Sequence, residues 1–170
     1  MRKLDIVDWG VILLGLDDIA GIEGRLYASD IANFAAHELM SISSGEDLFD
    51  VVACLALDSE ISTIVLREQV EKICNTKALN LDLSKRKWRL VAMEYLLAQL
   101  STESVYGLIE LSGFWAAHEW SSDAPPSMLG KRNDISSERY HSKAHFEHVI
   151  EEHQQWLQKE RTCLIPRNYD

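Results

Sequence analysis

The 170-residue chain has few of the residues that cross-link or interrupt a fold. Its three cysteines lie far apart with no CxxC pair, so neither a disulfide framework nor a cysteine-rich zinc site is expected. Cys54 and Cys74 stand among apolar residues at helical spacing and are predicted to be buried thiols of a reducing compartment. Proline is absent before Pro125, and long stretches without helix breakers favour helices.

Sequence motifs that mark known chemistry are also absent. The chain has no GxGxxG dinucleotide loop, no Walker phosphate loop and no GxSxG nucleophile elbow. We therefore predict that the protein is not an enzyme and needs no cofactor. The apolar run from Trp9 to Leu16 is too short to span a bilayer and lacks the flanking pattern of a signal peptide, which predicts a cytoplasmic protein.

The residues that are present predict helices. Apolar residues make up 46% of the chain and recur at three- and four-residue steps, which is typical of amphipathic helices in a globular protein. We predict an all-α fold, an irregular antiparallel bundle of about six or seven helices. The length predicts a single domain over residues 1–170, with a flexible tail from about residue 163.

Polar residues mark the expected helix starts. Ser29, Ser59 and Ser84 are predicted to begin the second, fourth and fifth helices, because serine is a favoured N-cap. Ser43 with Glu46 matches the capping box that opens a helix. The expected helices cover about residues 4–16, 29–40, 43–56, 59–73, 84–100, 102–115 and 137–161.

The chain carries a formal charge of −10, and the negative charge is concentrated in its first half. Residues 1–84 hold 6 Lys and Arg against 15 Asp and Glu, a net of −9, whereas residues 85–170 hold 11 against 12, a net of −1. Such a protein repels nucleic acids and anionic membranes and attracts basic proteins, although acidity also keeps proteins soluble. The basic cluster Lys85 to Arg89 is interpreted as a solvated face paired with nearby carboxylates.

Histidines form the most conspicuous candidate metal site. His141, His145, His148 and Glu152 are spaced four, three and four residues apart, which places them on one stripe of the last expected helix. Imidazole and carboxylate are ligands of zinc and iron. A single helix seldom supplies a complete site, so the alternative is that these are boundary residues with partly buried rings.

Clustered carboxylates offer a second possible site. Glu46, Asp47 and Asp50 lie within about one helical turn, and Glu68 with Glu71 forms a pair three residues apart. Facing acidic pairs of this kind bind magnesium in helical hydrolases. Acidic residues also suit the first turn of a helix, where the helix dipole stabilises negative charge. The second account explains the first cluster without a metal.

Five tryptophans are many for a chain of this length. Trp9, Trp88 and Trp115 occur at apolar helical positions and are predicted to lie in the core. Trp120 borders the loop expected over about residues 121–134. It is either an exposed anchor for a protein partner or a side chain that closes the end of the core.

The combination of small size, acidity, helicity and missing catalytic motifs resembles the immunity proteins that bacteria encode beside secreted or contact-delivered toxins. The opening Asp8 to Leu16, and Phe114-Trp115 with Pro125-Pro126, also look like small bacterial helical proteins. The resemblance covers the whole chain in its general character and rests on no diagnostic motif. It implies that the protein neutralises a toxin by binding it.

If the resemblance holds, an acidic surface would meet a basic toxin domain and occlude it, with charge speeding association. The residues expected to contact the partner are Asp47, Asp50, Asp58, Glu60 and Trp120. The alternatives are a metal-dependent hydrolase of the all-α type and a helical regulatory or scaffold subunit.

Overall fold

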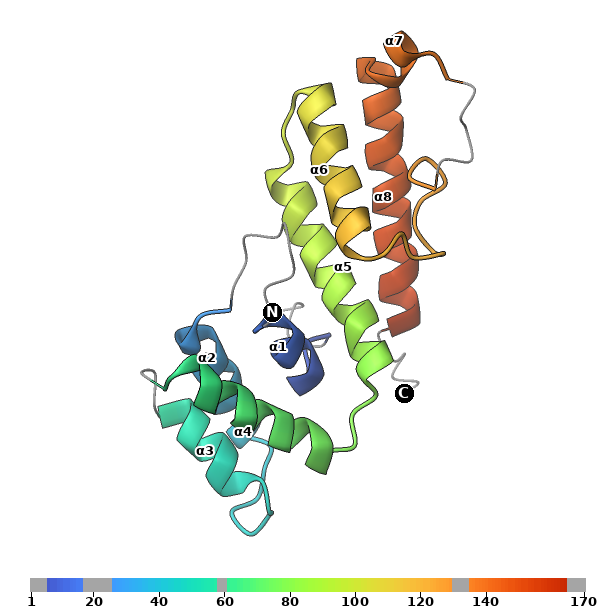
Figure 1. Cartoon of the computed structure of the whole chain (residues 1–170). Helices are drawn as coiled ribbons and strands as arrows, with labels where there is room; N and C mark the ends of the chain where they lie inside the picture. Colours follow the sequence, from blue (N-terminus) through green and yellow to red (C-terminus); the bar gives the residue numbers. More distant parts are fainter. Residues whose placement is uncertain (1–5, 17–25, 58–60, 130–134, 165–170) are drawn as a thin grey trace. The chain divides into compact units, whose positions relative to one another are not determined.

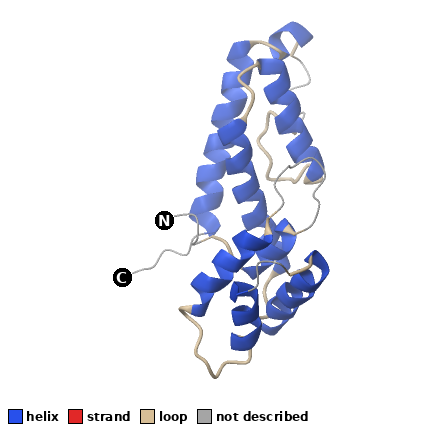
Figure 2. Cartoon of the chain, turned by 90° about the vertical axis from the view of Figure 1, so that its left-hand side faces the viewer, coloured by secondary structure: helices blue, strands red, loops and turns tan. Residues whose placement is uncertain are grey.

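The computed structural model describes residues 6–16, 26–57, 61–129 and 135–164, and this part contains eight α-helices and no strand (Figures 1 and 2). The predicted all-α class is confirmed. The helices are α1 (Trp9–Gly15), α2 (Ala28–Leu39), α3 (Phe49–Leu57), α4 (Thr63–Thr76), α5 (Leu81–Gln99), α6 (Ser104–Ala117), α7 (Ser137–Tyr140) and α8 (Lys143–Leu164).

The described residues form two compact units. The boundary between the units falls between Trp88 and Arg89, within α5. The N-terminal unit contains α1 to α4 and the first two turns of α5, and the C-terminal unit contains the rest of α5 with α6, α7 and α8. Because α5 contributes to both units, the single domain expected from the chain length remains a prediction. Residues 163 and 164 of the expected tail belong to α8, and the rest of it lies outside the described residues.

The core of the N-terminal unit forms because α1 to α4 each bury one apolar stripe. The fully buried residues follow the three- and four-residue steps of a helix, as Val70 and Ile73 do on α4. Trp9 of α1 packs edge-to-face on Phe34 of α2, with ring centroids 4.9 Å apart. Its indole N–H donates to the Glu38 carboxylate, 3.2 Å away, so the polar edge of the ring also has a partner.

Asp8 joins α1 to the start of α5. Its carboxylate caps α1 by accepting a hydrogen bond from the Val11 N–H at 2.9 Å. It also accepts from the Ser84 hydroxyl at 3.2 Å and pairs with the Lys87 ammonium at 2.6 Å. A side chain at Gly10 would overlap the Ser84 hydroxyl, so glycine is required where the two helices approach. One carboxylate therefore holds two helices that are far apart in the sequence.

The C-terminal unit is built on α5, α6 and α8, which lie side by side in Figure 1 with α6 antiparallel to α5. Leu108, Leu111 and Trp115 of α6 are buried, as are Val149 and His153 of α8. The residues expected in the core at Trp9, Trp88 and Trp115 are buried as predicted.

The second and fifth expected helices begin at other residues than predicted. The Tyr27 N–H donates to Asp30 at the start of α2, which leaves Ser29 inside the helix. Ser84 also lies inside its helix, because α5 begins at Leu81 and the Asn80 side chain accepts from the Leu83 N–H at 3.1 Å. Polar residues near a helix start compete as caps, and spacing alone does not rank them.

The third and fourth helices begin later along the chain than expected. The Glu46 carboxylate accepts from the Ser43 N–H at 3.0 Å as the capping box predicts, but this contact closes a turn and α3 begins only at Phe49. Ser62 caps α4 by accepting from the Val65 N–H at 3.5 Å. The expected cap Ser59 lies outside the described residues.

The last expected helix is divided in two. α7 ends at Tyr140 and α8 begins at Lys143. Between them the Ser142 hydroxyl donates to the Arg139 carbonyl at 2.7 Å and accepts from the His145 N–H at 3.2 Å. Serine in this role ends one helix and caps the next.

Two further expectations concern thiols and membranes. Cys74 is buried as predicted, but Cys54 is exposed, which corrects the prediction made from its apolar neighbours. None of the helices in the described ranges combines the length and apolarity that a membrane span requires.

Candidate functional site

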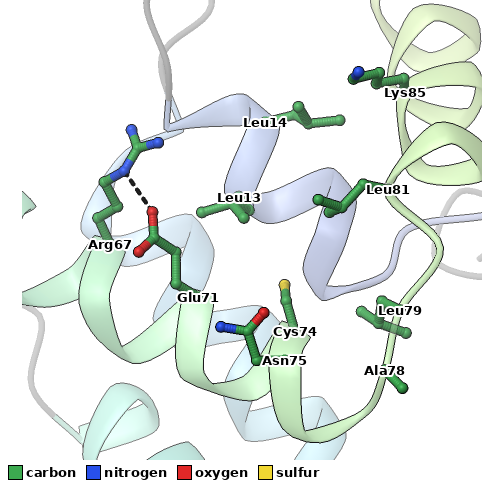
Figure 3. A pocket seen from close by; sticks show the side chains of 10 residues that line it. All are labelled: Leu13, Leu14, Arg67, Glu71, Cys74, Asn75, Ala78, Leu79, Leu81 and Lys85. Atoms are coloured by element: carbon green, nitrogen blue, oxygen red, sulfur yellow. Dashed lines mark hydrogen bonds and ion pairs between the residues drawn. The ribbon is translucent and has the colours of Figure 1, made fainter.

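A pocket of about 440 Å³ lies in the N-terminal unit, between α1, α4 and the start of α5 (Figure 3). Its volume falls within the range of small-molecule sites. The Cys74 thiol of α4 points toward α1, which lines the pocket with Leu13 and Leu14. The sequence did not predict a pocket here, although it marked Glu71 as a candidate metal ligand. The full lining is Leu13, Leu14, Arg67, Glu71, Cys74, Asn75, Ala78, Leu79, Leu81 and Lys85.

The described side chains that line this pocket include no strongly reactive group. Arg67 pairs with Glu71 at 2.8 Å on the exposed rim, so the two charges largely neutralise each other. Burial raises the pKa of the Cys74 thiol to about 11, with the negative charge of Asp8 acting in the same direction. A thiol with such a pKa is protonated at neutral pH and is a poor nucleophile. The pocket therefore has volume but no activated group.

The acidic residues expected to meet a partner are only partly described. Asp47 precedes α3 and Asp50 lies in its first turn, and both side chains are exposed. Neither forms an ion pair with another described residue. Asp58 and Glu60 lie outside the described residues. Two of the four carboxylates expected to contact a partner, Asp47 and Asp50, are therefore exposed at one turn and without an ion pair to any described residue.

The division into units changes the charge argument. Cutting the chain after Trp88 instead of residue 84 assigns the basic cluster to the N-terminal unit. The N-terminal unit then has 9 Lys and Arg against 15 Asp and Glu, a net of −6, and the C-terminal unit has 8 against 12, a net of −4. Both units are therefore acidic, and most of the asymmetry between the two halves came from the position of the cut.

The basic cluster pairs with carboxylates as predicted, but two of its members are mostly buried. Lys87 pairs with Asp8, and the Arg89 guanidinium lies 2.7 Å from the Asp123 carboxylate with its side chain only 12% exposed. The Arg89 guanidinium also lies over the rings of Trp115 and Trp156, 5.9 and 5.7 Å from their centroids. Arg89 is therefore a structural clamp that joins α5 to the loop after α6 and to the two indole rings.

Trp120 stands on a strained turn at the end of α6. Glu119 and Trp120 have φ of 54° and 50°, the left-handed region that costs about 1–2 kcal/mol for a residue other than glycine. The Trp120 N–H donates to the Trp115 carbonyl at 2.8 Å, which closes the last turn of the helix. Its side chain is 45% exposed. Trp120 is thus accessible, and its contact with a partner remains a prediction.

Two histidines of the C-terminal unit are held neutral. His153 is fully buried; its Nδ1 donates to the Val149 carbonyl at 2.7 Å, and its Nε2 accepts from the Trp115 indole at 2.9 Å. Burial lowers the pKa of His153. Burial also lowers the pKa of His118 to about 4, with the positive charge of Arg89 acting in the same direction. These rings serve packing and are not poised for acid–base chemistry at neutral pH.

The histidine stripe does not converge on one point. His141 caps the end of α7, so it is not on the same helix as His145. The rings of both histidines pack on Tyr140, with centroids 5.1 and 5.0 Å away. Within the described ranges, no three His, Cys, Asp or Glu side chains are grouped as a metal site.

The other two members of the stripe contact each other. His148 Nε2 lies 3.3 Å from the Glu152 carboxylate, which also accepts from the Ser127 N–H at 3.0 Å. Glu152 therefore ties the loop after α6 to α8, and a metal would have to replace these contacts.

Comparison with known proteins gives one match. A family model described as an uncharacterized protein conserved in bacteria (DUF2247) matches residues 2–161. No curated protein and no solved structure matches the chain. The matched range spans both units, so it concerns the whole described fold and not one group of helices. The chain belongs to the DUF2247 family of bacterial proteins.

Proposed function

We propose that the protein is a non-catalytic binding protein, of the immunity type, that neutralises a basic toxin by occluding it. The observation that carries the proposal is the exposed, unneutralised acidity at the start of α3, in a chain of which both units are net negative. Asp47 and Asp50 have no ion-pair partner among the described residues, so their charge is available to a basic protein. Complementary charge of this kind raises the rate of association.

The test uses the gene directly beside that of this chain. The C-terminal domain of the neighbouring product is expressed alone and together with the chain in a bacterial host. The proposal predicts that the neighbour stops growth, that the chain restores it, and that the purified proteins form a stoichiometric complex. A harmless neighbour, or a toxic one that the chain fails to neutralise, contradicts the proposal.

The acidic turn has a matched control. Asp47→Lys with Asp50→Lys should slow association and weaken its dependence on salt, because charges at the rim of an interface act mainly on the association rate. Asp82→Lys is the control for Asp50→Lys alone, since Asp82 is 92% exposed and both aspartates lie in the first turn of a helix. Equal effects of the two changes would remove the turn at Asp47 from the binding surface.

The rival hydrolase requires a metal. Elemental analysis of the purified chain separates the two classes, since a magnesium- or zinc-dependent enzyme binds its ion stoichiometrically. We expect no stoichiometric metal, because Glu152 already accepts the Ser127 N–H and His148 faces Glu152. One bound ion per chain, lost in the His148→Ala variant, would favour the hydrolase.

A further inference from the structure

The outward face of α6 is apolar. The α6 outer face consists of Val105, Tyr106, Ile109, Gly113 and Ala116, all of them exposed. The side chains of Tyr106 and Ile109 are each 60% exposed, and Glu110 is the only charged residue of the 14 in the helix. A helix that is apolar all round is normally covered on every side. The inner side of α6 is buried in the C-terminal unit, so the outer face is the side that lacks a cover there.

Two glycines on α6 show that this face is built differently from the inner one. A side-chain carbon at Gly107 would lie 2.5 Å from the ring of Phe146, so glycine is required there for helix packing. At Gly113 the same carbon would meet nothing within 4 Å. Glycine destabilises an exposed helix interior, and no described contact of the unit offsets that cost at Gly113. A partner that packs closely on the bare backbone at Gly113 would offset this cost.

The charges on α6 and in the segments that flank it in the sequence have one sign. Residues 90–130 contain no lysine or arginine and five acidic residues. Three of these, Glu103, Glu110 and Glu119, are exposed and lie before, within and after α6. An apolar centre containing tyrosine and surrounded by charge is the usual anatomy of a protein interface. The rim excludes an acidic partner and complements a basic one.

We infer that the α6 outer face is the docking surface for a basic protein, which places an apolar side chain over Gly113 while its lysines or arginines meet the three glutamates. The identity of that protein as a toxin rests on the proposed function. The chemistry of the occupant, apolar in its centre and basic at its rim, follows from the face itself. This surface lies in the C-terminal unit, whereas the sequence placed the binding face in the first half of the chain.

The substitutions are chosen in pairs. Ile109→Ala removes an exposed side chain of the α6 outer face, and Ile64→Ala makes the same change at a 73% exposed position of α4. Glu110→Gln removes one rim charge and keeps an acceptor for the Ser101 N–H, which now donates to Glu110 at 3.1 Å. Gly113→Gln covers the bare backbone with a good helix former. Circular dichroism checks that every full-length variant is folded.

Two probes separate the surface from the function. The first is the toxin-like C-terminal domain encoded by the neighbouring gene, and the second is a synthetic amphipathic helix made of leucine and lysine. For both probes we expect Ile109→Ala and Gly113→Gln to weaken binding about tenfold or more, and Ile64→Ala to change it by less than about twofold. Glu110→Gln should reduce the dependence of binding on salt.

The outcomes are distinct. If the neighbouring protein is not bound but the peptide binds with this pattern of variants, the proposed function fails and the docking surface stands. If the neighbouring protein is bound and neutralised equally well by Ile109→Ala and Ile64→Ala, the function stands and the surface is wrong. If wild-type protein dimerises in sedimentation and Ile109→Ala abolishes the dimer, a second copy of the chain covers the face and the inference is overturned.

Discussion

The two glycines of α6 give a sharp prediction for stability, because the same substitution should have opposite effects six residues apart. Gly107→Ala would place a carbon 2.5 Å from two ring atoms of Phe146 and 3.0 Å from the Ser101 carbonyl oxygen. Carbon atoms prefer separations of about 3.5–4.0 Å, so the ring or the helices must move by about 1 Å. Phe146 is 5% exposed and has little room to do so.

The expected changes in unfolding free energy are the balance of two opposing effects. Overpacking of a core costs about 1–3 kcal/mol, and replacing glycine by alanine within a helix returns about 0.5–1 kcal/mol. Gly107→Ala should therefore lower the free energy of unfolding by about 1–2 kcal/mol. Gly113→Ala meets no atom within 4 Å and should raise the free energy of unfolding by about 0.5–1 kcal/mol. For a chain of this length, each kcal/mol corresponds to a change in Tm of about 2–4 °C.

Urea unfolding followed by tryptophan fluorescence and circular dichroism measures both variants under one condition. A double-mutant cycle adds the physical cause. Phe146→Leu replaces the ring that a side chain at position 107 would overlap by a smaller side chain. In that background, Gly107→Ala should lower the free energy of unfolding by at least about 1 kcal/mol less than in the wild type. Equal stability of the two alanine variants, or an unchanged cost beside Leu at position 146, would refute the argument from close packing.

Two further predictions concern the polar contacts of the C-terminal unit. His118 has a folded-state pKa of about 4, below the ordinary 6.5, so stability present above pH 6.5 should be lost as the pH falls toward 4. The expected loss of unfolding free energy is about 1–2 kcal/mol after allowance for solvent screening. Urea unfolding at pH 7 and pH 4.5 measures it, and the difference between the two pH values should be smaller by this amount in the His118→Gln variant. Arg89→Lys should cost about 1–2 kcal/mol in unfolding free energy, because a lysine ammonium cannot keep the guanidinium contact with Asp123 and lie over both indole rings at once. The exposed control Arg67→Lys should change stability by less than about 0.5 kcal/mol, and equal effects of the two lysines would contradict the clamp.

Helical periodicity predicted the fold class because each helix buries a stripe at three- and four-residue steps. The helix starts were less predictable, since several polar residues stand near each start. Ser84 illustrates the reason. Asn80 caps α5 by accepting from the Leu83 N–H, so Ser84 lies inside the helix and its hydroxyl donates instead to Asp8, which lies 76 residues earlier. Spacing along the chain contains no information about such a contact.

The candidate site was harder to predict than the fold. α6 has apolar residues on all sides, so the sequence did not indicate that Ile109 would face outward while Leu108 is buried. The histidine stripe failed as a geometric group for a different reason. One serine, Ser142, ends α7 and caps α8, so that His141 leaves the helix that contains His145. A four-residue spacing implies a shared face only within an unbroken helix.

The turn that follows α6 stores backbone strain. A helix can end in the left-handed conformation at little cost when glycine occupies the position, but here Glu119 and Trp120 do so. The contact of Arg89 with Asp123 and the packing of its guanidinium on Trp115 hold the segment, which offsets the strain. Ending the helix does not require these two residues. The left-handed backbone leaves Glu119 and Trp120 exposed directly after the last turn of α6. Backbone strain of about 1–2 kcal/mol at each residue is therefore retained in an exposed turn, where the packing of the following segment stabilises it.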